Sequence, residues 1–190
     1  ATLVDIESSA GTVQYTGDCT IDRSSISDSR LSCRDAGRLS LLGSRFSSTT
    51  VSAALVECVA CSFAEATVLA SSLQCSSCEG AVSVSAAETS IRNSAFTELH
   101  YLPKDRSAHL LVSSTVAKCA VDAAVSARVE VKDIKLSGTF EIHEGVALDV
   151  TGKMTDIGEA ALLLNDNGHA HFAAGFAEGV PYKQRGALSF

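Results

Sequence analysis

One six-residue pattern recurs along the chain and limits the possible folds more than any other feature. It consists of an apolar residue, four mostly small or polar residues and a second apolar residue, as in Ile21-Asp-Arg-Ser-Ser-Ile26 and Ile91-Arg-Asn-Ser-Ala-Phe96. Copies begin at residues 21, 41, 58, 75, 91, 111, 131, about 151 and 171. The steps of 16 to 20 residues between most copies are too short for a β-α-β unit, which needs about 30 residues.

Short alternating segments lie between the copies and read as β-strands. Gly80-Ala-Val-Ser-Val84 and Gly186-Ala-Leu-Ser-Phe190 are nearly the same segment. The chain lacks both the leucine-rich repeat signature and the glycine-rich calcium nonapeptide. We therefore expect an all-β fold: a single-stranded parallel β-helix, or solenoid, of about nine coils of 16–20 residues, with strands of successive coils about 4.8 Å apart.

The composition fits a narrow interior. The chain has 27 Ser and 27 Ala but no Trp and a single Met. If the coils stack in register, the second apolar residue of each copy forms one buried column, which Gly80 interrupts. The expected column is Ile26, Phe46, Phe63, Phe96, Val116, Leu136 and Phe176.

The pattern covers the whole chain, so we expect one β-helix domain over residues 1–190. The chain starts and stops inside strand-like segments, which favours a segment of a longer solenoid. Residues 98–107 form the most polar stretch and are expected to be a loop insertion.

The Gly-Ala-Val-Ser-Val strand at residues 80–84, followed by Ile91-Arg-Asn-Ser-Ala-Phe96, resembles right-handed parallel β-helix repeats. Pectate-lyase-like solenoids are the broad group, and repeats of the polymorphic outer-membrane-protein type, found in surface proteins, are the closer match. This chain has one Gly where those repeats have two, and Phe46, Phe63 and Phe96 lack an Asn three residues later. The resemblance implies right-handed coiling and a surface location.

Charge and motifs exclude several functions. The net charge is −7 without a basic run, so nucleic acid is not an expected partner. No apolar stretch reaches the ~18 residues of a membrane span, and no direct membrane insertion is expected. We find neither a nucleophile elbow nor a phosphate-binding loop, and we expect no cofactor and no catalytic residues.

The cysteines leave three readings open. Cys58, Cys61, Cys75 and Cys78 form a C-x2-C-x13-C-x2-C arrangement, which nearly matches a four-cysteine zinc site. The repeat instead places Cys58 beside Cys75, and Cys61 beside Cys78, on adjacent coils within disulfide reach. A ladder of free buried thiols is the third reading.

The leading hypothesis is a non-enzymatic structural or adhesive segment of an extracellular or surface-exposed rod or filament. It would act through lateral or end-to-end contacts with protein partners, and glycans are further candidate partners. The N-terminus lacks a signal peptide, so secretion would require a processed chain. The first alternative is a β-helix that binds or cleaves polysaccharide, with Glu141, Asp133, Asp149 and Asp156 as candidate carboxylates. The second alternative is a zinc-bound interaction module built on the four cysteines.

Overall fold

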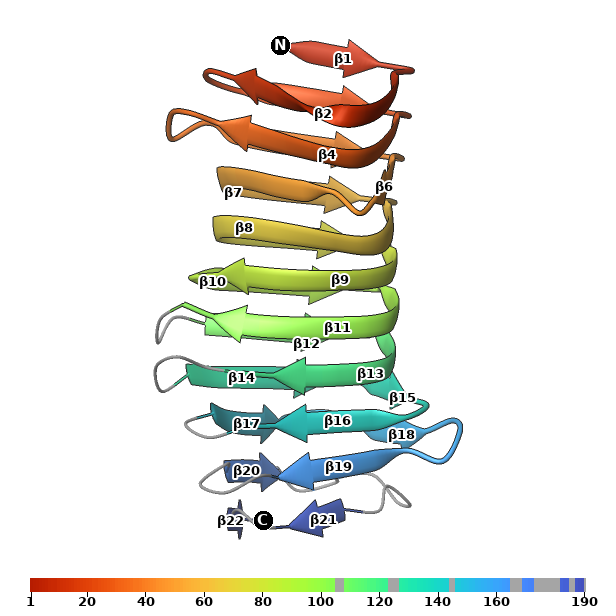
Figure 1. The fold of residues 1–190 in the computed structure, drawn as a ribbon. Helices are drawn as coiled ribbons and strands as arrows, with labels where there is room; N and C mark the ends of the chain where they lie inside the picture. The colour runs from red at the N-terminus through yellow and green to blue at the C-terminus, as the bar shows by residue number, and fades with distance from the viewer. Residues whose placement is uncertain are drawn as a thin grey trace.

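The computed structural model describes residues 1–104, 108–122, 127–143, 146–164, 169–172, 182–184 and 187–189. In these ranges the chain forms 22 strands and no helix. All of the paired strands run parallel, and they stack as a β-solenoid of about nine turns with the two termini at opposite ends (Figure 1). The all-β fold predicted from the repeat is confirmed.

Each coil contributes strands to three faces. Face A runs in the order β1-β3-β5-β7-β8-β10-β12-β14-β17-β20-β22. Face B runs in the order β2-β4-β7-β8-β9-β11-β13-β16-β19-β21. Face C is short and joins the end of face A to the start of face B.

The strands of face A are β1 (Thr2–Val4), β3 (Cys19–Asp22), β5 (Arg38–Leu42), β10 (Glu88–Arg92), β12 (Ala108–Val112), β14 (Ala127–Lys132), β17 (Val146–Val150), β20 (His169–Phe172) and β22 (Ala187–Ser189). Those of face B are β2 (Glu7–Tyr15), β4 (Ser25–Cys33), β9 (Glu79–Ala86), β11 (Ala95–Pro103), β13 (Thr115–Val121), β16 (Thr139–Ile142), β19 (Ala161–Leu164) and β21 (Tyr182–Gln184). Strands β7 (Thr50–Val59) and β8 (Ser62–Ser76) bend from face B to face A, and face C has β6 (Arg45–Ser47), β15 (Ile134–Leu136) and β18 (Met154–Asp156).

The first positions of the repeat form a continuous column on face A. Backbone register joins, in order, Leu3, Ile21, Leu41, Cys58, Cys75, Ile91, Leu111, Val131, Val150 and Phe172. The sequence pattern therefore gives the correct register for the earlier coils. Val150 begins the degenerate copy expected at about residue 151. In the next coil the pattern is displaced by one residue, because Phe172 takes the place expected for residue 171.

The predicted buried column lies on face C. Register joins Ile26, Phe46, Phe63, Gly80, Phe96, Val116 and Leu136, and every member except Gly80 is at most 3% exposed. The rings of Phe46 and Phe63 stack with centroids 5.8 Å apart. Phe176, the last predicted member, lies outside the described residues.

Coil length varies at the edge where face B returns to face A. Leu31 on face B and Leu41 on face A are ten residues apart, whereas their register equivalents Val51 and Cys58 are seven apart. Residues 98–103, expected to begin a loop insertion, instead form the second half of β11 and pair with β9. Residues 105–107 of that expected insertion lie outside the described ranges.

Candidate functional site

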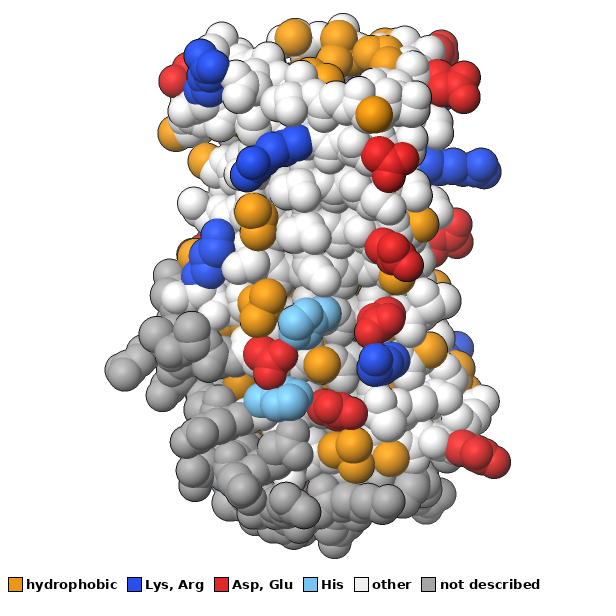
Figure 2. All heavy atoms as spheres, in the orientation of Figure 1, with side chains coloured by type: hydrophobic (Ala, Val, Ile, Leu, Met, Phe, Trp, Pro, Cys, Tyr) orange, Lys and Arg blue, Asp and Glu red, His pale blue; other side chains and the backbone are white. Residues whose placement is uncertain are grey.

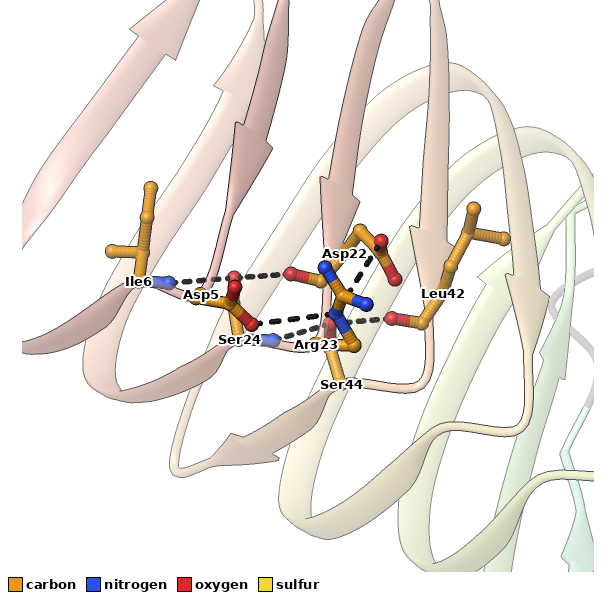
Figure 3. Close-up of polar contacts among 7 residues, drawn as sticks. All are labelled: Asp5, Ile6, Asp22, Arg23, Ser24, Leu42 and Ser44. Atoms are coloured by element: carbon orange, nitrogen blue, oxygen red, sulfur yellow. Dashed lines mark hydrogen bonds and ion pairs between the residues drawn. The ribbon is translucent and has the colours of Figure 1, made fainter.

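A column of buried hydroxyl groups lies at the corner between faces A and C. Ser24 Oγ donates to the carbonyl of Asp22 (2.9 Å) and accepts from the backbone N–H of Ile6 on the preceding coil (3.1 Å). Ser44 repeats this arrangement one coil later and accepts from the N–H of Ser24 (3.0 Å; Figure 3). Equivalent bonds recur at Ser94 and Ser114. Each hydroxyl thereby satisfies a backbone donor at a corner where strand pairing is interrupted.

At each of these corners, one residue turns the chain in the left-handed region. Asp5, Arg23, Gly43, Ala60, Ser77, Asn93 and Ser113 have φ between 47° and 56°, and only one of them is glycine. The N–H of each donates to a carbonyl of the next coil, as from Arg23 to Leu42 at 2.9 Å (Figure 3). These seven corners therefore bond neighbouring coils along the solenoid axis.

Cysteines replace serines in two coils of this corner column. Cys61 Sγ lies 3.5 Å from the carbonyl of Val59, and Cys78 Sγ lies 3.4 Å from that of Ser76. The serine hydroxyls likewise donate to the carbonyl two residues earlier. In the same two coils, Cys58 and Cys75 occupy the face A column that elsewhere holds larger aliphatic side chains. The structure thus brings together all four predicted cysteines.

The four cysteines lie together in the interior of two adjacent coils. Cys58 and Cys75 are register partners, and the thiols of Cys61 and Cys78 donate to the carbonyls of Leu41 (3.2 Å) and Cys58 (3.6 Å). The thiols of Cys61 and Cys75 and a backbone N–H donate to Cys78 and hold its pKa below the ordinary value of 9.0. The pKa values of Cys61 and Cys75 are raised, because their protons are held in hydrogen bonds and their thiols are buried. All seven cysteines of the chain are thiols in this structure.

Metal coordination demands that donors converge on one point. Among the described residues, no group of three or more His, Cys, Asp or Glu side chains is placed to hold a metal ion. Cys58 lies beside Cys75, and Cys61 lies beside Cys78, on adjacent coils. The repeat predicts this arrangement both for two disulfides and for a row of free thiols.

A second site, the face B groove, lies where β9 is one residue short. Phe63 and Ala66 of β8 are three positions apart, whereas their partners Gly80 and Val82 are two apart. The neighbouring strand β11 also carries an extra residue at this point. Gly80 makes the tight corner with φ of 106°, and the face is hollowed into a groove of about 530 Å³.

Charged and polar side chains line the face B groove. Glu65, Glu98, Glu141, His100 and Lys118 reach it from β8, β11, β13 and β16. Lys118 Nζ pairs with Glu98 Oε1 at 2.9 Å across the coils, and Glu98 raises the pKa of Lys118 by hydrogen bonding and charge. Figure 2 shows histidine side chains among acidic and basic ones on this side of the molecule.

Asp122 links two histidines beside the groove. Its carboxylate lies 2.7 Å from His100 Nε2 and 3.2 Å from His143 Nδ1. His143 Nε2 is also 3.6 Å from Glu141. This network is not among the sites predicted from the sequence, although the spacing of residues 100, 122 and 143, close to the repeat length, is a signal for it.

The carboxylates proposed from sequence are not gathered at one place. Asp133 accepts the backbone N–H of Lys153 (3.0 Å) at a corner, and Asp149 pairs with Arg128 on face A. Glu141 alone lines the groove on face B. The side chain of Asp156 lies outside the described part of the structure.

Comparison with known proteins adds no relative. No protein family, curated protein or solved structure matches the chain. Within the described ranges no helix is long and apolar enough to cross a bilayer. The β-solenoid architecture therefore stands on the structure itself.

Proposed function

We propose that the chain is a structural segment of a surface-exposed rod that acts through lateral contacts with other proteins. The observation that carries the proposal is the axial bonding: seven corners in succession each donate an N–H to the following coil, beside strand ladders that stay in register. With coils about 4.8 Å apart, nine turns extend about 43 Å. Such a stack keeps a fixed length and exposes long lateral surfaces for contacts with other proteins.

The extracellular location is part of the proposal. Its support is the resemblance of the repeat to surface-protein solenoids, together with the acidic charge and the small-residue columns. The finer relationship to repeats of the polymorphic outer-membrane-protein type is proposed on the same residues.

Photo-crosslinking in intact source cells tests the lateral contacts. A photoreactive residue replaces Arg92 on face A, Ala64 on face C or Glu98 on face B, all of which are exposed. We expect crosslinks to a defined protein from one face and few from the others, with the protein accessible to antibody without permeabilisation. An exclusively intracellular protein without crosslinks from any face would contradict the proposal.

A second candidate function is glycan binding in the face B groove. The groove volume lies within the usual range for ligand sites, and carboxylate, imidazole and ammonium groups can hydrogen-bond sugar hydroxyls. Binding of acidic and neutral oligosaccharides by wild type would be compared with H100A and E98Q. The matched control is E88Q on face A. Loss confined to the groove variants supports this function, and unchanged binding in every variant contradicts it.

A further inference from the structure

The thiols occupy positions where the fold needs no cysteine. The corner column is filled by serine at Ser24, Ser44, Ser94 and Ser114, and their hydroxyls make the necessary hydrogen bonds. The face A column is filled by Ile21, Leu41, Ile91 and Leu111 in neighbouring coils. Both columns change to cysteine in the same two consecutive coils. Packing alone does not require this coincidence.

The coincidence creates two cross-coil pairs. Cys58 and Cys75 are direct register partners on adjacent parallel strands, and both are buried. Cys61 and Cys78 precede the register partners Ser62 and Glu79. The N–H of Glu79 donates to the carbonyl of Cys61 at 2.9 Å, and both cysteines are buried. Adjacent strands about 4.8 Å apart lie within the Cα separation that a disulfide spans.

We propose that the cluster is a redox-controlled staple in which Cys58 bonds to Cys75 and Cys61 bonds to Cys78, locking two coils together. The proposal rests on the proposed structural function. The disulfides would join adjacent coils covalently and so strengthen the rod along its axis. The four cysteines are not bonded to one another in this structure.

The oxidant is a small-molecule disulfide or a thiol–disulfide oxidoreductase. One cysteine thiolate attacks the oxidant disulfide, forming a mixed disulfide and releasing one thiolate. The partner cysteine, as thiolate, then attacks the mixed disulfide, closing the cross-coil bond and releasing the second thiolate. The two cysteine protons pass to the released thiolates. Each pair thus loses two electrons, which reduce one oxidant disulfide to two thiols.

Burial controls the rate of this reaction. Cys75 is 6% exposed, whereas Cys58, Cys61 and Cys78 are at most 1% exposed. An oxidant therefore reaches all four thiols far more readily during folding than in the folded chain. We expect oxidised glutathione to form the bonds faster during refolding than in the native protein.

Peptide mapping distinguishes pairing across the two coils from pairing within each C-x-x-C. A protease that cuts after glutamate cleaves at Glu57, Glu65 and Glu79 and separates residues 58–65 from residues 66–79. Cross-coil pairing joins these two peptides and lowers their summed mass by four hydrogens. Pairing within each C-x-x-C leaves them separate. Separate peptides after oxidation during refolding, or unmodified thiols, would overturn the proposal, and retained zinc would replace it with the metal site.

A variant with the side chains of the neighbouring coils provides the control. The combination C58L, C61S, C75I and C78S places in each column residues that it already holds. We expect oxidation to raise the Tm of wild type by roughly 10 °C and to leave that of the variant unchanged. An equal shift in both proteins would contradict the staple. These measurements use the isolated chain, whereas the crosslinking experiment uses cells. Absence of the disulfides would therefore leave the lateral contacts supported, and absence of crosslinks would leave the disulfides supported.

Discussion

A Cβ atom on Gly80 would lie 1.9 Å from the carbonyl oxygen of Phe63. Gly80 also has φ of 106°, which side-chain-bearing residues rarely adopt. The two restrictions have one cause: β9 crosses the corner with one residue fewer than β8 and β11. The same short path interrupts the buried phenylalanine column and hollows the face B groove.

Replacing Gly80 should therefore be far more damaging than replacing another corner glycine. We expect G80A to lower the free energy of unfolding by at least about 3 kcal/mol. G43A is the matched control, since Gly43 has φ of 53°, its nearest contact is a flexible Arg23 carbon at 3.8 Å, and Ala60 already occupies the equivalent corner. Its cost should be about 1 kcal/mol. Urea denaturation measures both, and similar losses would refute the short-corner explanation.

The repeat in the sequence was sufficient to predict the solenoid because each column repeats a chemical type, as at Leu41, Ile91 and Leu111. It placed the four paired cysteines correctly for the same reason. The face B groove could not be predicted, since it arises from a single missing residue beside Gly80. The candidate carboxylates do not form one cluster, because Glu141 and Asp149 come from strands of different faces: Glu141 lies on β16 of face B and Asp149 on β17 of face A.

The left-handed corners offer a stabilising substitution. Ala60 is exposed and has φ of 54°, so its Cβ is strained in a conformation that glycine adopts freely. We expect A60G to raise the Tm by roughly 2–4 °C, corresponding to about 1 kcal/mol. The control A64G alters an exposed residue of β8 and should lower the Tm, because glycine is unfavourable within a strand. A lower Tm for A60G in thermal unfolding would contradict the expected strain.

The corner hydroxyls should be replaceable by thiols but not by methyl groups. S44A leaves the buried N–H of Ser24 without its acceptor and should cost about 1–3 kcal/mol. S44C should cost clearly less, because Cys61 and Cys78 make the equivalent contacts in the same column. Urea unfolding under reducing conditions compares the variants. Equal costs for alanine and cysteine would show that the side-chain hydrogen bond contributes little.

Alkaline pH should weaken the fold through the buried thiol of Cys119. Burial raises its pKa above the ordinary value of 9.0, so the folded chain keeps a proton that the unfolded chain releases. Stability from this group is complete below pH 9 and falls by about 1.4 kcal/mol per pH unit above it, until the folded thiol itself ionises.

C119V should remove that part of the pH dependence. Its free energy of unfolding, measured in urea from pH 8 to pH 11, should have a slope shallower than that of wild type by about 1.4 kcal/mol per pH unit. Both proteins keep part of the decrease in stability with pH, because other buried thiols, such as Cys61 and Cys75, also have raised pKa values. Parallel pH profiles would exclude Cys119 as a contributor.

Coil length varies at the edge where face B returns to face A, and left-handed corners bond neighbouring coils along the axis. Nine residues lie between Leu31 and Leu41, and six lie between Val51 and Cys58, yet the residues at both ends remain in register. New segments can therefore be grafted at this edge with little penalty. The molecule provides a rigid spine to which recognition loops of different lengths can be attached at regular intervals.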